Sequence, residues 1–201
     1  MAEARSLVVY VVDDDAAIRD SVALMLGLAG HVTRLFADAE SLLVAFDPGW
    51  SGCVVADLRL PGLSGVELQA RVRQRGSAIP FVIITAHGDV PAARAAFRGQ
   101  AVDFIEKPFD DTQLRSAIET AFALETERLG SAELRREDAA KLARLTPRER
   151  EVLEHAVSGL HAKEIASALG ISPRTVEVHK MRIMEKLEVR NIAELVRLRF
   201  R

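Results

Sequence analysis

The chain has 201 residues, of which 49% are hydrophobic and 28% are charged, so we expect one or two globular domains with a sizeable core. It has no apolar run of roughly 18 residues, no signal-peptide pattern and a single cysteine, which argues against a membrane span, secretion and an internal disulfide and favours a cytoplasmic protein. The net charge of −2 combines −7 over residues 1–140 with +5 over residues 141–201, which fits an acidic metal or phosphate site followed by a polyanion-binding unit.

Short apolar runs alternate with segments of helical periodicity over residues 5–125. This alternation indicates a parallel α/β sheet, because parallel strands are joined by crossover helices and are buried on both faces. The crossovers should be right-handed. The expected strands are residues 7–12, 32–36, 53–56, 81–85 and 101–105, and the expected helices are residues 16–29, 39–46, 66–72, 91–98 and 111–129.

The last of these helices carries an apolar face that continues beyond the expected sheet. Gly130-Ser131 is expected to interrupt it, and a charge-rich helical stretch follows. We interpret residues 126–144 as a partly helical linker, which fits either coiled contacts between protomers or a solvated spacer.

A second domain is expected over residues 145–201. Thr146-Pro147-Arg148-Glu149 combines an N-cap, a proline at the first helical position and a capping-box glutamate, so it predicts a helix start. Later glycines and N-caps divide the remaining residues into three more helices, which together predict a compact all-α domain. The expected helices are residues 147–158, 162–169, 173–187 and 191–200.

Polar side chains stand at the ends of four expected strands. Asp13 and Asp14 follow the first strand, Asp57 the third and Lys107 the fifth, and Thr85 ends the fourth. Since the carboxyl ends of parallel strands meet at one edge of a sheet, we expect these side chains to share a crevice. Crowded carboxylates favour a cation, and an oxygen-only set suits Mg²⁺. Asp57 can then attack phosphorus while Mg²⁺ and Lys107 neutralise charge.

Residues 5–125 resemble the receiver domain of two-component response regulators. The matching motifs are residues 11–15 (VVDDD), 57–65 (DLRLPGLSG), 84–86 (ITA) and 103–109 (DFIEKPF). The resemblance implies a (βα)5 flavodoxin-like, doubly wound sheet of strand order 2-1-3-4-5, with Asp57 as the phosphoacceptor. It also implies a sensor histidine kinase as partner, and a chain that is not an enzyme beyond gaining and hydrolysing its own phosphoryl group.

The resemblance also implies roles for the other residues of the crevice. Asp14 and Asp57 would ligate Mg²⁺ directly, Asp13 mostly through water, and Arg59 through its backbone carbonyl.

Three further roles follow from the same resemblance. Thr85 and Phe104 resemble the switch pair, and Lys107 the cation that contacts the phosphoryl group. The Lys107-Pro108 bond is expected to be cis. Arg59 and His87 stand where receivers flank the attacking water, so they are expected to tune the lifetime of the phosphoryl group.

An enzyme remains the alternative for the first domain. Asp13-x-Asp15 with Thr85 and Lys107 is also similar to haloacid-dehalogenase-type phosphatases, in which the first acid is the nucleophile. Against this alternative, Ala17 stands where that family has Thr or Val, and no cap insertion is present.

The second and third helices of the all-α domain are joined by the short turn Leu169-Gly170-Ile171-Ser172, a pattern typical of a helix-turn-helix. On the third helix, Val178 and Met181 lie opposite the apolar face expected to be buried. Exposed apolar residues on a charged helix fit contact with thymine methyl groups in a major groove. A protein- or RNA-binding module is the alternative.

Residues 145–198 resemble a LuxR-type DNA-binding domain, through residues 145–153, 163–166, 169–172, 175–179 and 186–187. The resemblance implies that Glu177, Val178 and Met181 face base edges with Arg182 nearby, and that the helix from Asn191 mediates dimerisation. It also implies contacts to DNA phosphates, for which the candidates are Lys163, Arg174, Thr175, Lys180 and Lys186.

A receiver joined to a LuxR-type domain is the architecture of the NarL/FixJ family, and residues 85–91 and 104–109 resemble its FixJ-like branch. The expected function is phosphorylation-dependent regulation of transcription. The chain would form a homodimer on phosphorylation and bind promoter DNA, with RNA polymerase as a further candidate partner and no membrane association.

Overall fold

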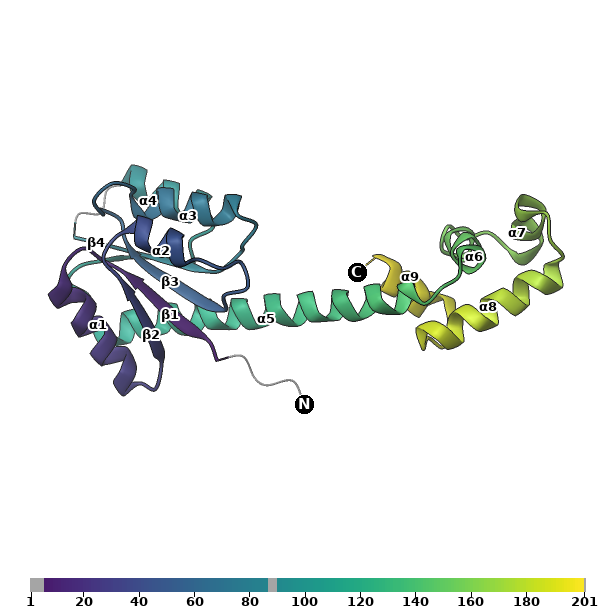
Figure 1. Cartoon of the computed structure of the whole chain (residues 1–201), viewed down its shortest axis with the longest axis horizontal. Coiled ribbons are helices and arrows are strands. Elements are labelled where there is room, and N and C mark those ends of the chain that lie inside the picture. The colour runs from purple at the N-terminus through teal and green to yellow at the C-terminus, as the bar shows by residue number, and fades with distance from the viewer. Residues whose placement is uncertain (1–5, 87–89, 201) are drawn as a thin grey trace. The chain divides into compact units, whose positions relative to one another are not determined.

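The computed structural model describes residues 6–86 and 90–200 (Figure 1). The chain divides into two compact units, one ending at Arg128 and the other beginning at Leu129. Each unit has hydrophobic core clusters of its own. Within the described ranges, no helix is long and apolar enough to cross a membrane.

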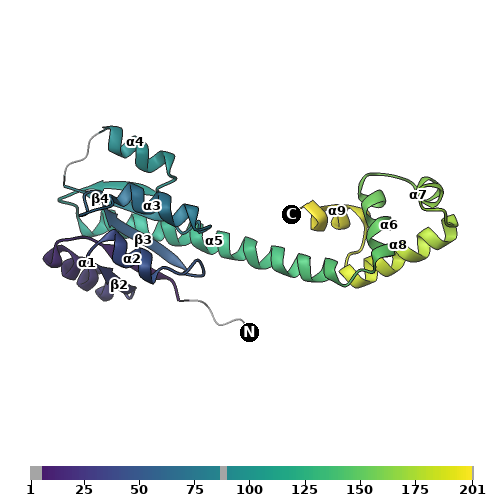
Figure 2. The same cartoon turned by 45° about the horizontal axis from the view of Figure 1, so that its top comes forward.

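The first unit is a parallel sheet with helices on both faces (Figures 1 and 2). Its strand order is β2-β1-β3-β4-β5, which confirms the expected doubly wound receiver fold. The strands are β1 (Val8–Val12), β2 (Val32–Phe36), β3 (Gly52–Asp57), β4 (Phe81–Thr85) and β5 (Asp103–Glu106), and the helices are α1 (Ala16–Leu28), α2 (Ala39–Ala45), α3 (Gly65–Gln74), α4 (Val90–Arg98) and α5 (Asp111–Ala143).

Alternate residues of the central strands point into two different cores. Tyr10 and Val12 of β1 join the cluster beneath α2 and α3, whereas Val9 and Val11 join the cluster beneath α1 and α5. Because both faces are covered, the central strands consist of continuous apolar runs. Trp50, the only tryptophan of the chain, stacks on Tyr10 with ring centroids 4.0 Å apart and ring planes 3° apart.

Helix α5 corrects the prediction that Gly130-Ser131 interrupts the last helix of the first part. The helix continues without a break to Ala143, and a Cβ atom on Gly130 would meet nothing within 4 Å. An interior glycine costs about 1 kcal/mol relative to alanine, and the surrounding Leu, Ala, Glu and Arg residues favour helix strongly enough to outweigh that cost. The segment from 126 to 143 is therefore helical throughout.

The second unit adds four helices after α5 within the described residues, as the sequence predicts. Thr146 and Glu149 form the expected capping box at the start of the first of them. The helices pack around one core cluster, which includes Val152, Ile165 and Leu195. They are α6 (Pro147–Val157), α7 (Ala162–Leu169), α8 (Pro173–Leu187) and α9 (Ile192–Phe200).

Candidate functional site

The parallel sheet brings the predicted site residues to one edge. Asp57 is the last residue of β3, where it pairs with Ile84 of β4, and Asp13 directly follows β1. Thr85 ends β4, and Lys107 directly follows β5. Asp13 and Thr85 are fully buried, and Asp57 is 7% exposed, so the edge forms a largely desolvated polar site.

Lys107 joins the two buried carboxylates. Its Nζ atom lies 2.6 Å from Asp13 Oδ2 and 2.5 Å from Asp57 Oδ2. The second oxygen of Asp57 accepts a hydrogen bond from the backbone N–H of Arg59 at 2.9 Å, and that of Asp13 accepts one from the N–H of Asp15 at 3.0 Å. The nucleophile predicted from the sequence is therefore held at both oxygens, within reach of one ammonium group.

Burial and hydrogen bonding act in opposite directions on the charges of this site. Burial raises the pKa of the Asp13 carboxyl, and hydrogen bonds from Lys107 and Asp15 offset that effect in part. Burial by itself would lower the pKa of Lys107, but the hydrogen bonds to Asp13 and Asp57 outweigh it, so the pKa of Lys107 is raised. The lysine therefore stays protonated between the two carboxylates.

The same acids form a candidate metal site. One carboxylate oxygen from each of Asp13, Asp14 and Asp57 lies within 4.8 Å of the others. Asp14 is exposed, so the cluster is open to solvent on one side. Three carboxylates face one ammonium group, and the remaining negative charge and oxygen-only donor set fit a hard cation that keeps part of its water shell, such as Mg²⁺.

The residues predicted to switch or tune the site differ in burial and surroundings. Phe104 on β5 is half-buried and packs against the core cluster beneath α2 and α3. The Arg59 side chain is exposed beside the site. His87 lies outside the described residues. The Lys107-Pro108 bond is cis, as the resemblance implies.

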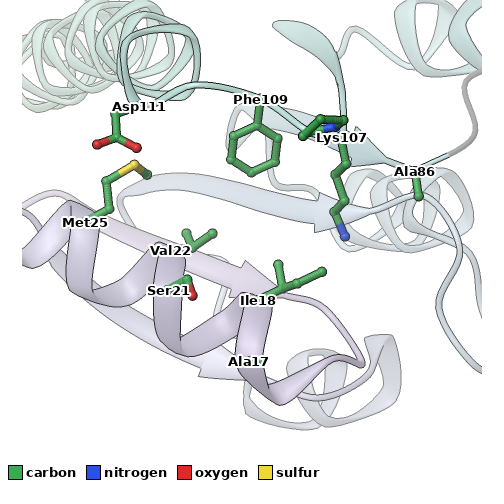
Figure 3. A pocket seen from close by; sticks show the side chains of 10 residues that line it. Ala17, Ile18, Ser21, Val22, Met25, Ala86, Lys107, Phe109 and Asp111 are labelled. Atoms are coloured by element: carbon green, nitrogen blue, oxygen red, sulfur yellow. The ribbon is translucent and has the colours of Figure 1, made fainter.

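A hollow of about 640 Å³ opens beside Lys107, between α1 and the segment that follows β5 (Figure 3). Ile18, Val22 and Met25 line it from α1, and Phe109 lines it from the other side. The sequence shows the apolar face of α1 but gives no sign of this hollow, because its two walls are about ninety residues apart in the chain. It adds an apolar surface next to the acidic site.

Helices α7 and α8 form the predicted helix-turn-helix. Gly170 caps α7 in the left-handed conformation with φ 64°, and the Ser172 hydroxyl accepts the N–H of Thr175 at the start of α8. Val176, Ile183 and Leu187 are buried. One face of α8 therefore packs on the core and leaves the other side for contacts.

Most of the predicted DNA-contact residues lie on the exposed side of these helices. Val178 and Met181 are 36% and 65% exposed although they are apolar, which is the pattern of an interaction surface. The exposed polar candidates are Lys163, Arg174, Thr175, Glu177 and Arg182.

Two of the lysines predicted to contact phosphates have partners within the protein. Lys180 Nζ lies 3.4 Å from Glu177 Oε1 on the same helix. Lys186 Nζ lies 2.7 Å from Oε2 of the buried Glu149 on α6. The second pair was missed from the sequence, since its members are 37 residues apart and each fits a local role.

Two family models match the chain. A family model described as the response regulator receiver domain matches residues 9–119, and one described as bacterial regulatory proteins of the luxR family matches residues 143–199. These matches favour the receiver over the phosphatase alternative, and a DNA-binding output over a protein- or RNA-binding module.

Individual relatives match almost the whole chain. The chain is 46% identical over 194 residues to the transcriptional regulatory protein FixJ of Bradyrhizobium diazoefficiens, covering 96% of this chain and 94% of that protein. It is 38% identical to the C4-dicarboxylate transport transcriptional regulatory protein DctR of Rhodobacter capsulatus, with 96% and 99% covered. The solved structure of the response regulator StyR matches with a TM-score of 0.84 and 40% identity, covering 96% of this chain and 98% of that one.

FixJ and DctR are named as transcriptional regulators, not as catalytic enzymes. The receiver match covers the Asp13, Asp57 and Lys107 site, and the luxR match covers the helix-turn-helix. The chain therefore belongs to the response-regulator family, as a FixJ-like transcriptional regulator in which a receiver controls a LuxR-type DNA-binding domain through phosphorylation.

Proposed function

We propose that Asp57 accepts a phosphoryl group from the phosphohistidine of a sensor histidine kinase. An Asp57 carboxylate oxygen attacks phosphorus, the P–N bond breaks as the P–O bond forms, and the imidazole leaves. The observation that carries this proposal is the Lys107 ammonium group within 2.6 Å of both buried carboxylates, Asp13 and Asp57. In phosphoryl transfer, such placement and charge neutralisation supply most of the catalysis.

The acidic cluster is the proposed Mg²⁺ site. Asp14 and Asp57 would ligate the ion directly, Arg59 through its backbone carbonyl and Asp13 through water. When bound, the ion would neutralise charge on the phosphoryl oxygens. The chain's own part is to hold Asp57 by the Arg59 N–H and to hold Lys107 beside it.

Thr85 and Phe104 are the proposed switch pair, and Arg59 and His87 the proposed tuning pair. Thr85 is buried at the end of β4 beside the site, and Phe104 lies on the neighbouring strand β5. A phosphoryl group adds roughly −1.5 to −2 charges at Asp57, which can draw the Thr85 hydroxyl toward it and let Phe104 turn inward. Arg59 and His87 would flank the water that later hydrolyses the group.

The apolar hollow beside Lys107 is the proposed docking surface for the kinase. It lies next to the phosphoacceptor site and presents Ile18, Met25 and Phe109 to a partner (Figure 3). A partner with a helical apolar face would cover it while placing its phosphohistidine at Asp57.

Residues 145–201 are the proposed DNA-binding domain, residues 1–125 the receiver and residues 126–144 the linker. Glu177, Val178 and Met181 would meet base edges, with Arg182 nearby, and the homodimer formed on phosphorylation would present two copies of α8 to promoter DNA in the cytoplasm. Phosphate contacts are proposed for the exposed and half-exposed polar residues Lys163, Arg174, Thr175, Lys180 and Lys186.

Mass spectrometry after treatment with acetyl phosphate and Mg²⁺ tests the phosphoacceptor. The wild-type chain should gain one phosphoryl group on Asp57, the Asp57→Asn variant none, and the exposed control Asp20→Asn should be labelled like wild type. Chelation of Mg²⁺ should abolish labelling. A phosphoryl group on Asp13 would instead favour the phosphatase alternative and contradict the proposal.

A further inference from the structure

The C-terminal end of α8, the proposed recognition helix, is occupied by a residue that the local backbone disfavours. Glu188 is the C-cap of α8 and has φ 58° and ψ 39°, in the left-handed region. Among the described residues other than glycine, only Gln100 shares a positive φ with it. Helices commonly place Gly at such a position, because a Cβ atom is strained there.

The charge of Glu188 is also unfavourable at this place. A helix carries partial negative charge at its C-terminal end, so a carboxylate there is repelled and a lysine or arginine is preferred. Glu188 therefore conflicts with both the backbone and the helix dipole of α8. Conflicts of this kind between local preference and the observed fold are expected at functional or strained positions.

Two cations offset the unfavourable charge of Glu188. Lys141 Nζ lies 2.8 Å from Glu188 Oε2, and Arg144 Nη1 lies 3.9 Å from Glu188 Oε1. The hydrogen bond from Lys141 holds the pKa of Glu188 below its ordinary value. The Glu188 side chain is 62% exposed, and exposed ion pairs add little to the free energy of unfolding. The contact therefore matters for positioning and contributes little to stability.

The two cations belong to the end of α5. Lys141 lies in its last turn, and Arg144 follows it. Leu142 packs on the core of the second unit, and Arg150 donates to the carbonyl oxygen of Ala143 at 3.4 Å. Both views of the molecule show the end of α8 beside the end of α5 (Figures 1 and 2).

The other end of α8 is held from within the helix-turn-helix. Ser172 caps the helix, and Arg148 of α6 donates to the carbonyl oxygen of Leu169, just before the turn. Both ends of α8 are therefore held within the second unit, and the C-terminal end is held by the last turn of α5 and by Arg144. The first half of α5 belongs to the receiver core, where Leu114 and Ile118 are fully buried.

We propose that Glu188, with Lys141 and Arg144, forms a coupling contact through which the position of α5 sets the orientation of α8. Glu188 and Lys141 are positioning residues for DNA binding and do not themselves contact bases. A displacement of α5 after phosphorylation moves Lys141, and Glu188 transmits that movement to the recognition helix. The inference rests on the proposed function, because it requires phosphorylation at Asp57 and DNA binding through α8.

Four variants of the full-length chain test this contact. Glu188→Gly and Glu188→Gln both remove the carboxylate, and glycine also relieves the left-handed strain, so its fold is expected to be at least as stable as that of wild type. Glu185→Gln is the matched control, because it removes one exposed negative charge from the same end of α8. The double variant Lys141→Glu with Glu188→Lys restores the pair with reversed charges.

The probe is a labelled duplex selected from a random library by the wild-type chain in beryllofluoride and Mg²⁺. The quantity measured is the ratio of Kd without and with beryllofluoride, alongside urea unfolding of each variant. Glu188→Gly and Glu188→Gln should lower that ratio at least about threefold, Glu185→Gln should leave it unchanged, and the charge-reversed pair should recover most of it.

An unchanged ratio in Glu188→Gly, or an equal loss in Glu185→Gln, would overturn the coupling contact while the wild-type response still supports the proposed function. If beryllofluoride does not change the Kd of the wild-type chain for any selected duplex, the proposed function is overturned, and the coupling contact with it.

Discussion

At the scale of single residues, Glu149 shows how a buried charge can be held by a distant partner. It is 3% exposed, and it accepts hydrogen bonds from Lys186 Nζ at 2.7 Å and from the N–H of Thr146 at 2.8 Å. Burial by itself would raise its pKa, but these hydrogen bonds outweigh burial and lower the pKa to about 2. Because the pKa of Glu149 is lower in the folded chain than in the unfolded chain, its charged form stabilises the second unit.

The substitution Glu149→Gln should destabilise the second unit by about 1–3 kcal/mol at pH 7, because Lys186 loses its buried partner. The folded pKa lies below the ordinary value of 4.5, so this stability is present above pH 4.5 and is lost as the pH falls toward 2. Urea unfolding across that pH range measures the free energy of unfolding. The difference in this free energy between wild type and variant should become smaller as the pH falls.

The exposed Glu151→Gln variant is the control for this prediction and should change stability by about 0.5 kcal/mol or less at every pH. If the difference in free energy of unfolding between wild type and Glu149→Gln stays constant from pH 7 to pH 2.5, the carboxylate charge is not what stabilises the domain.

The residues of the acidic site were predictable, whereas the Glu149–Lys186 pair was not. Asp13, Asp57 and Lys107 each follow an apolar strand, and the geometry of a parallel sheet brings strand ends together whatever the details of packing. Lys186 and Glu149 meet only because α6 and α8 pack at a particular distance and rotation. Their sequence roles, a surface lysine and a capping-box glutamate, are complete without that contact.

At the scale of elements, α5 shows a local signal that its context overrides. Gly130-Ser131 is a common helix-ending pair, yet the helix continues through it. Glu125, fully buried, forms a two-point ion pair with Arg128 one turn earlier, with contacts of 2.6 and 2.7 Å. Leu142 anchors the far end on the second core. With both ends anchored, the segment between them stays helical although Gly130 favours helix less than its neighbours do.

Gly130→Ala should therefore stabilise α5 by roughly 1 kcal/mol, because the site is open and alanine is the better helix former. Hydrogen exchange of the amides at positions 126–137 should slow several-fold. Gly27→Ala is the matched control, since Gly27 is also helical and open but lies in α1. Equal exchange in wild type and Gly130→Ala would mean that the glycine does not weaken the helix.

At the scale of the whole molecule, one phosphoryl group acts on the equilibrium between an inactive and an active state of the protein. Moving a two-state equilibrium from 1:99 to 99:1 needs about 5.5 kcal/mol of differential stabilisation. In the proposed mechanism, new contacts of the phosphoryl group with Thr85 and Lys107 would supply one part, and burial of surface in the proposed homodimer would supply another. Dimerisation would make the switch depend on protein concentration.

Size-exclusion chromatography with X-ray scattering tests this dimer. The chain should elute as a smaller species alone and as a dimer after beryllofluoride and Mg²⁺ treatment, with a fraction of dimer that rises with protein concentration. Asp57→Asn should stay in the smaller form under both conditions. A wild-type elution profile that ignores treatment, with modification of Asp57 confirmed by mass, would contradict dimerisation on phosphorylation.

The fold of both units was predictable from patterns with short range: strand and helix periodicity, caps and turns. The left-handed backbone of Glu188 at the end of α8 was not predictable, because its residue type disfavours that conformation. The apolar hollow beside Lys107 escaped prediction for a different reason, since Ile18 and Phe109 are far apart in the chain.

The stack of Trp50 on Tyr10 has a consequence for spectroscopy. The chain has one tryptophan and one tyrosine, and both lie in the first unit, 4.0 Å apart. Absorbance at 280 nm and intrinsic fluorescence therefore come from the receiver alone, whereas far-ultraviolet circular dichroism reports the helices of both units. The receiver can thus be followed by itself within the full-length chain, without attaching a dye.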